Sequence, residues 1–193
     1  MLTSLMMVVL AAPPPALPLT TDDRLRLERG EVVVRSWKSK RGFPRGLARV
    51  LIEAPPERVF RIIDNCNRYR YNMKLVSHSK QLSRKGPVVV CEVVVDLPFP
   101  FGSLRSVTKG IHQVGPPMWG RKWSLVSGDY QVNQGAWELT RYRGDIKRTL
   151  VTYRTHIEPD MSLPDFVVAG SQKPSLPMML KGLRDLVVRN RKP

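Results

Sequence analysis

Hydrophobic and polar residues alternate from Ala48 to Ala54, and this pattern changes at the two prolines that follow. The alternation has the two-residue period of a strand that is buried on one face. Pro56 suits the first turn of a helix and disfavours helical geometry at Pro55, so a helix should begin between them. Apolar residues then recur with helical spacing. The sequence predicts a strand over residues 48–54, a helix over residues 56–65 and a second short helix after it.

Elsewhere the chain alternates between strand patterns and residues that favour turns. A short capped helix is predicted over residues 21–30, and a strand over residues 31–38. After the helical pair, strand patterns occur at residues 75–83, 88–97, 103–114, 121–130, 135–143 and 147–158. One of the turns between them is expected at Asn133–Gly135. Short links between consecutive strands favour an antiparallel sheet.

The chain closes with a second helical region. It begins with a capping arrangement at Ser162, with Pro164 early in the first turn. An apolar stripe then follows at helical spacing: Leu176, Met179, Leu180, Leu183 and Val187. Because Pro174 cannot donate a backbone hydrogen bond, a second start or a kink is expected near residues 173–176.

Four local sequences, together with the order of the predicted elements, resemble the START-like superfamily, also called SRPBCC or helix-grip proteins. They are the strand-to-helix junction at residues 52–60, the stretch at residues 64–73, the strand at residues 135–139 and the helix start at residues 162–164. The chain is similar to ubiquinone-binding START proteins and to polyketide cyclase-type proteins.

The resemblance implies an α+β, helix-grip fold. Its curved antiparallel sheet would have about seven strands, with two short helices near the N-terminal side. A long C-terminal helix, expected to be kinked, would enclose an apolar cavity against the sheet. Residues 1–20 are accordingly assigned to a signal-like or disordered segment, and residues 21–193 to a single START-like domain.

Strand alternation and the implied cavity nominate inward-facing residues as the lining of a ligand site. In the last strand, Val151 and Tyr153 share one face. The candidate lining residues are Ile63, Tyr69, Met73, Val89, Cys91, Val93, Arg105, Trp123, Trp137, Leu139, Val151, Tyr153, Phe166, Met179 and Leu183. Arg105 is the candidate polar anchor for an oxygen-bearing ligand, because arginine donates strong hydrogen bonds to oxygen; the alternative is an exposed arginine on the strand. The alternative for each residue taken singly is that it fills an ordinary core.

The sequence contains no nucleophile elbow, phosphate-binding loop, dinucleotide fingerprint or zinc-protease motif. His78, His112 and His156 are isolated, and the last two are expected at the surface or at the rim of a pocket. No catalytic residue, cofactor or metal is therefore expected. The predicted function is binding or transfer, without catalysis, of a lipophilic small molecule: a lipid, an isoprenoid quinone or a polyketide-like compound. Release is expected through a gap between the last helix and the loops at residues 98–102 and 115–120.

Two alternatives come from the same resemblance. A polyketide aromatase or cyclase could position a reactive chain in the cavity without a catalytic triad. A START-like protein associated with RNA or the ribosome would suit the net charge of +16. The basic residues occur in almost every segment instead of in one block, which argues against nucleic acid as a partner. The same charge makes an anionic membrane surface a further candidate partner, since each basic residue near the head groups contributes about 1 kcal/mol.

Residues 1–20 carry no charged side chain and contain an apolar run from Leu5 to Ala12. The run resembles the hydrophobic region of a secretory signal and is too short to span a bilayer. Export to the periplasm or out of the cell is expected; the protein would be cytoplasmic if this segment is not a signal. Cys66 and Cys91 occupy apolar positions, so buried free thiols are favoured, although export would allow the two to pair.

Overall fold

The chain folds into a layer of strands and a layer of helices in the computed structural model, which describes residues 17–38, 44–161 and 165–189. The elements in chain order are α1 (Thr21–Glu28), β1 (Val33–Lys38), β2 (Pro44–Ile52), α2 (Pro56–Asp64), the 3-10 helix η1 (Cys66–Arg68), α3 (Tyr69–Asn72), β3 (Val76–Lys85), β4 (Val88–Asp96), β5 (Ser103–Gln113), β6 (Trp119–Gly128), β7 (Tyr130–Tyr142), β8 (Asp145–Pro159) and α4 (Asp165–Arg189).

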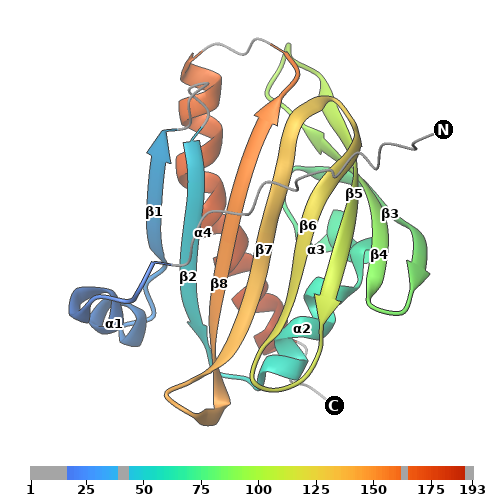
Figure 1. The fold of residues 1–193 in the computed structure, drawn as a ribbon. Helices are drawn as coiled ribbons and strands as arrows, with labels where there is room; N and C mark the ends of the chain where they lie inside the picture. The colour runs from blue at the N-terminus through green and yellow to red at the C-terminus, as the bar shows by residue number, and fades with distance from the viewer. Residues whose placement is uncertain (1–16, 39–43, 162–164, 190–193) are drawn as a thin grey trace, which may run out of the picture.

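The strands form one antiparallel sheet in the order β1-β2-β8-β7-β6-β5-β4-β3. Figure 1 shows the curvature of this sheet, with α4 running along its rear face and α2 and α3 beside it. The pairing of β2 with β8 brings the first and last parts of the sheet together in space. The α+β, helix-grip fold is therefore confirmed, with eight strands where about seven were expected.

The junction between β2 and α2 has the geometry that its prolines predict. Pro55 is the N-cap in extended conformation, and Pro56 occupies the first helical position. One side of α2 is buried through Val59, Phe60 and Ile63. These side chains join the main core, which also contains Val50 of β2 and Leu180 of α4. The apolar stripe of α2 therefore fixes this helix on the same face of the sheet as α4.

Strand β7 is unbroken from Tyr130 to Tyr142, so the turn expected at Asn133–Gly135 is wrong. Gly135 lies inside the strand at a point of close approach. A Cβ atom there would lie 2.3 Å from the Arg154 backbone oxygen and 2.4 Å from the Trp123 ring. The glycine therefore makes room for a neighbouring strand and an aromatic ring, and the chain reverses earlier, at Asp129.

Helix α4 is also continuous from Asp165 to Arg189, so the second helix start expected near residues 173–176 is wrong. A proline inside a helix removes one backbone hydrogen bond. Packing of an apolar helix face against a sheet can outweigh such a local loss, and α4 packs along β2. The capping arrangement expected at Ser162–Pro164 lies outside the described residues.

Cys66 and Cys91 form a disulfide, so the expectation of free thiols is wrong. Cys66 belongs to η1 and Cys91 to β4, and their Cα atoms are 6.3 Å apart. Both residues are fully buried beside Tyr69 and Val89. Each sequence pattern places its cysteine inward, but only the tertiary arrangement brings η1 onto β4.

Replacing both cysteines by alanine is expected to lower the free energy of unfolding by about 3 kcal/mol, because the disulfide closes a loop with a sequence separation of 25 residues. Urea unfolding followed by tryptophan fluorescence measures this difference. A reducing agent should lower the unfolding midpoint of the wild type and leave that of the double variant unchanged. A wild-type midpoint that ignores the reducing agent would contradict the disulfide.

Candidate ligand-binding site

A small apolar recess lies between the sheet and the helical layer. Its lining comes from α2, α3, α4, β7 and the residue that follows α3: Ile62, Ile63, Asn72, Met73, Trp137, Met179, Leu183 and Leu186. The recess and the gaps around it amount to about 260 Å³, a figure that includes interatomic space and open solvent. The space that an atom could occupy inside it holds about one water molecule. Pockets that hold drug-sized ligands usually measure about 300–1,000 Å³. A lipophilic ligand would therefore have to separate the helices from the sheet.

The structure brings five of the candidate lining residues directly to this recess: Ile63, Met73, Trp137, Met179 and Leu183. Others are buried in the two cores next to it: Tyr69, Val89, Cys91, Leu139, Val151 and Tyr153. Val93 and Trp123 pack against these cores and are partly buried. The side chain of Phe166 lies outside the description.

Arg105 does not point into the interior. It is exposed on the outer face of β5, where its guanidinium forms an ion pair with Glu92. Arg105 therefore cannot be the interior anchor. Three lining residues were not among the candidates: Ile62, Asn72 and Leu186. Ile62 and Asn72 belong to the segments expected to close one end of the cavity, whereas Leu186 was missed. Leu186 follows Leu183 at helical spacing, and this periodicity was the signal that could have identified it.

Three aromatic rings form the wall of the interior on β6, β7 and β8. Tyr153 lies between Trp123, with ring centroids 5.7 Å apart, and Trp137, with ring centroids 4.3 Å apart. Burial raises the pKa of the Tyr153 hydroxyl to about 12. At neutral pH the hydroxyl therefore stays protonated, and the wall presents aromatic faces with one neutral polar group.

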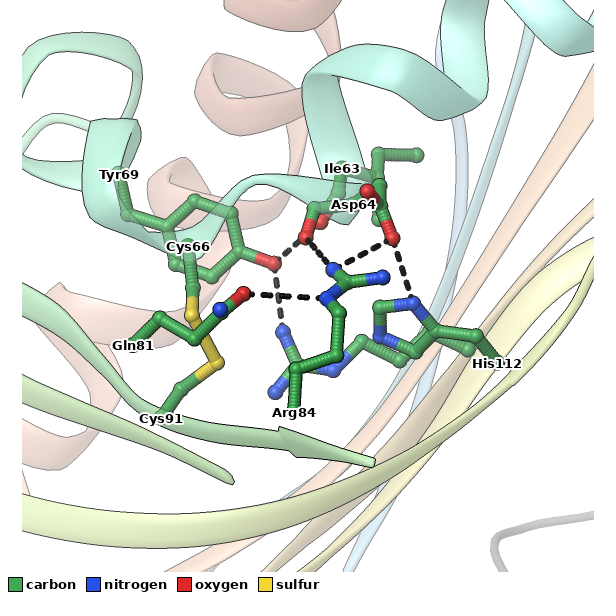
Figure 2. Close-up of polar contacts among 9 residues, drawn as sticks. Ile63, Asp64, Cys66, Tyr69, Gln81, Arg84, Cys91 and His112 are labelled. Carbon is green, nitrogen blue, oxygen red and sulfur yellow. Dashed lines mark hydrogen bonds and ion pairs between the residues drawn. A yellow bond between two sulfur atoms is a disulfide. The ribbon is translucent and has the colours of Figure 1, made fainter. Parts of the chain in front are cut away.

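A polar cluster surrounds the C-terminal end of α2, as Figure 2 shows. The Asp64 carboxylate accepts a hydrogen bond of 2.9 Å from Arg84 Nη2 and lies 2.7 Å from Nδ1 of His112. Arg84 also donates to the Asp64 backbone oxygen, at 3.2 Å, and to the side chain of Gln81, at 3.3 Å. A cation that reaches the last carbonyls of a helix is favoured by the helix dipole. The cluster therefore fastens α2 to β3 and β5.

His112 is buried inside this cluster, so its expected place at the surface or rim is wrong. Burial is the largest cause that lowers the pKa of His112, and the positive charge of Arg121 lowers it further, against the opposing effect of Asp64. The neutral imidazole then donates through Nδ1 to Asp64. This leaves Nε2 as an unprotonated acceptor, and it has no hydrogen-bond partner among the described residues.

Arg121 is the buried cation of the interior. It is 4% exposed, and its Nη1 donates a 2.6 Å hydrogen bond to the Tyr69 hydroxyl. That hydroxyl in turn donates to the Ile63 backbone oxygen at 2.5 Å. Arg121 forms no ion pair within the described part of the chain, and its Nε–H is unpartnered there. Its neighbours across the sheet are His112 on β5 and Trp137 on β7, which lines the recess.

The alternation of β6 contained the information that points to Arg121. Trp119, Arg121 and Trp123 occupy every second position, and all three lie on the helix-facing side of the sheet. Arg121 was missed because it is one of the many basic residues that occur in almost every segment of the chain. Alternation places Arg121 on the same face as Trp119 and Trp123, but it does not state whether that face is the inner one.

His156 is likewise buried, although it was expected in solvent. Its side chain is 7% exposed, and its Nε2 lies 2.7 Å from the Glu158 carboxylate on the outer face of β8. Strand alternation correctly placed His156 on the outer face of β8, but it could not show that the side chain is buried there. Among the described residues, no group of three or more histidine, cysteine or acidic side chains could hold a metal ion. No described helix is long and apolar enough to cross a membrane.

The loops expected to border one exit lie at opposite ends of β5. One precedes Ser103 and the other follows Gln113, so the strand separates them by about 35 Å. They cannot frame a single gap. The recess lies away from both loops, beside α3 and the C-terminal half of α4, and is lined there by Asn72, Met73 and Leu186.

A curved sheet that grips a C-terminal helix, with an apolar recess and a buried polar cluster between them, defines a START-like protein. The sequence profile of the family described as "Polyketide cyclase / dehydrase and lipid transport" matches residues 52–184. The chain belongs to this family.

Several solved structures share the fold. A STAR-related lipid transfer protein from Xanthomonas axonopodis has a TM-score of 0.71 at 17% identity, covering 81% of this chain and 93% of that protein. Human STARD10 has a TM-score of 0.71 at 15% identity, covering 90% and 81%. The Zhui aromatase/cyclase from Streptomyces sp. R1128 has a TM-score of 0.51 at 14% identity, covering 81% and 88%. No curated protein matches the sequence.

Replacing His112 by glutamine is expected to flatten the pH dependence of stability on the acid side of neutrality. Unfolded His112 binds a proton near pH 6.5, whereas the folded residue does so only at lower pH. The unfolded state therefore binds more protons in this window, and the wild type loses stability as the pH falls from about 7 through the folded pKa. The slope is about 1.4 kcal/mol per pH unit for each proton by which the two states differ.

Urea unfolding of both proteins across this pH range measures the difference. The other histidines and the carboxylates titrate in both proteins, so only the difference between the two curves reports His112. Parallel curves would show that His112 has the same proton affinity in the folded and unfolded states, which would contradict the buried neutral imidazole.

Proposed function

We propose that this protein binds and transfers one lipophilic molecule that carries an oxygen-bearing end. Its apolar body would occupy the space between the sheet and α4, and its oxygen would accept a hydrogen bond from Arg121. The observation that carries this proposal is the buried guanidinium, which has no carboxylate partner among the described residues and lies one strand from the recess. Removing a cation from water is costly unless something compensates it. An oxygen or carboxylate of a ligand is a fitting compensation.

The boundary between the helices can open with little loss of specific contacts. The recess is bounded by apolar side chains of α2 and α4, and their packing is not directional. One hydrogen bond on this boundary joins Arg58 Nη2 to the Val187 backbone oxygen, at 3.1 Å. A ligand that enters would replace contacts between apolar side chains by equivalent contacts with its own chain.

Family membership supports the same proposal, since the family description names lipid transport, and the Xanthomonas protein is titled a lipid transfer protein. Export remains part of the proposal. The disulfide supports it, because structural disulfides persist mainly in oxidising compartments.

Replacing Arg121 by methionine is expected to weaken the binding of cis-parinaric acid, a fluorescent fatty acid, about tenfold, because hydrogen bonds to a charged donor contribute about 1.5–3 kcal/mol. The methyl ester of the same probe should lose less affinity than the acid on this replacement, since its carbonyl still accepts a hydrogen bond but carries no charge. Fluorescence titration measures both. Equal affinity of the two proteins for the acid would remove Arg121 from the site.

A pair of tryptophan variants on α4 tests where the apolar part of the probe lies. Met179→Trp would fill the recess and should weaken the binding of acid and ester alike. Val188→Trp is the matched control, because Val188 is 50% exposed on the same helix and does not line the recess. If Met179→Trp binds both probes as tightly as the control does, the probe lies elsewhere.

A second candidate function is favoured by one observation, the Asp64–His112 pair. Asp64 orients the imidazole through Nδ1, and Nε2 is a buried, unprotonated acceptor without a partner among the described residues. This is the arrangement of a general base whose tautomer is fixed by a carboxylate. With a polyketide-like substrate in the recess, Nε2 could remove a proton next to a carbonyl, and Arg121 could stabilise the developing oxyanion.

His112→Gln separates the two functions. If the protein is a cyclase, the wild type should convert a poly-β-keto thioester to a cyclised product, detected by chromatography and mass spectrometry. The variant should form this product at least a hundredfold more slowly. Binding of cis-parinaric acid should be retained by the variant. Identical product formation with wild type, variant and buffer would exclude this second function and leave the binding function untouched.

A further inference from the structure

The segment from Asn65 to Leu75 presents exposed apolar and basic side chains beside the recess, and we propose that it docks on an anionic lipid bilayer. Tyr71 is 66% exposed and Leu75 is 50% exposed. Between them in the sequence lie Asn72 and Met73, which line the recess. The same short stretch therefore faces the ligand site with one set of side chains and solvent with another.

The charge of this segment suits a negatively charged bilayer. It contains Arg68, Arg70 and Lys74 and no acidic residue. All three cations are exposed, and they form no ion pair with a described residue. They are thus available to lipid phosphates, at roughly fivefold in the partition coefficient for each cation close to the surface.

Tyr71 has the properties of an interfacial residue. The Arg70 guanidinium lies over its ring, 4.5 Å from the centroid, and Arg70 Nη2 donates to the Tyr71 hydroxyl. An aromatic ring with a polar end, carried next to a cation, fits the boundary between head groups and acyl chains.

Folding stability does not account for the exposed Leu75. Its backbone is in the left-handed region, with φ at 73°, which is unfavourable for leucine. Its backbone oxygen is held there by the N–H of Asp96, at 2.8 Å, while the Asp96 carboxylate accepts a hydrogen bond from Ser77. Because the side chain is half exposed, burial repays little of this conformational cost. A membrane would bury it.

The segment is held rigidly enough to present these side chains in a fixed arrangement. The disulfide ties η1 to β4. The Arg70 N–H donates to Ser79 Oγ at 2.9 Å, and Asn67 Oδ1 accepts from the Gln81 N–H at 2.7 Å. Little conformational entropy would therefore be lost on docking.

A competing surface is the β4–β5 loop, where Phe99 is 97% exposed. The strand ends next to that loop carry exposed acidic residues. The Asp129 carboxylate accepts from the Arg105 N–H near the start of β5, and Asp160 donates its own N–H to the Asp129 backbone oxygen. The exposed Asp96 adjoins both surfaces. Residues 97–102 of the loop contain no basic residue, whereas the Asn65–Leu75 segment contains three, so attraction to an anionic bilayer favours the segment over the Phe99 loop.

Co-sedimentation of the full chain with vesicles tests this docking surface. The docking proposal rests on the proposed function only in that docking would serve the transfer of a ligand. Vesicles of phosphatidylcholine with phosphatidylglycerol should bind the wild type more than tenfold better than phosphatidylcholine alone, and added salt should weaken the binding. Arg70→Glu with Lys74→Glu, and separately Tyr71→Ala with Leu75→Ala, should each reduce the partition coefficient about tenfold or more. Lys109→Glu with Lys122→Glu on the outer sheet face is the matched control, expected to change it less.

Three results would overturn the proposal: a wild type that does not bind anionic vesicles, equal losses in the two charge-reversed variants, or a loss confined to Phe99→Ala. Thermal unfolding of each variant verifies that it is folded. Titration with cis-parinaric acid in parallel keeps the two proposals apart. A wild type that binds the probe but not anionic vesicles disproves the docking surface and leaves the proposed ligand binding intact.

Discussion

Burial of α4 against the inner face of the sheet is the interaction on which the rest of the structure depends. Leu176, Leu180 and Val187 of α4 are buried with Val50 and Ile52 of β2. Each such side chain contributes about 1.5–3 kcal/mol when fully buried. Gly46 of β2 permits the close approach, since a Cβ atom there would lie 2.7 Å from the Leu176 side chain. The recess lies on this same boundary, so the contact that stabilises the fold is also the one a ligand must open.

The polar cluster at the end of α2 supplies the specificity that apolar packing lacks. Asp64 connects α2 to β3 through Arg84 and to β5 through His112. Tyr69 connects Arg121 to the Ile63 oxygen. The unpartnered Nε2 of His112 and Nε of Arg121 cost about 1–3 kcal/mol each unless water or a ligand satisfies them. Buried polar atoms without partners, close to a recess, are more typical of a binding site than of a structural core.

The sequence predicted those features that depend on local geometry. Prolines marked the start of α2, alternation identified the inner faces, and the order of the elements indicated the helix-grip fold. Features that depend on distant segments were missed. The pairing of Cys66 with Cys91 needs η1 to lie on β4, and the burial of His112 needs α2 to cover β5.

Alternation alone leaves the positions of two arginines undecided. Arg105 and Arg121 both lie in alternating strands of similar composition, and alternation alone does not state which face is inner. A β-bulge between Val107 and Thr108 also shifts the register between β5 and β6. The choice between the two faces is made by the apolar neighbours of each strand, and Trp119 and Trp123 decide it for Arg121.

Helix α3 and the 3-10 turn before it show which side of the recess can move. A helix of four residues is not stable by itself, so its shape depends on the disulfide, on the Tyr69 hydroxyl and on the bonds to Ser79 and Gln81. These contacts are directional, and breaking them would leave polar groups without partners, among them the buried Tyr69 hydroxyl. The contacts of Leu180 and Leu183 on the opposite side are apolar and can be exchanged for those of a ligand. Opening of the recess is therefore less costly by displacement of α4 than by release of α3, which would stay in place as the fixed edge of the site.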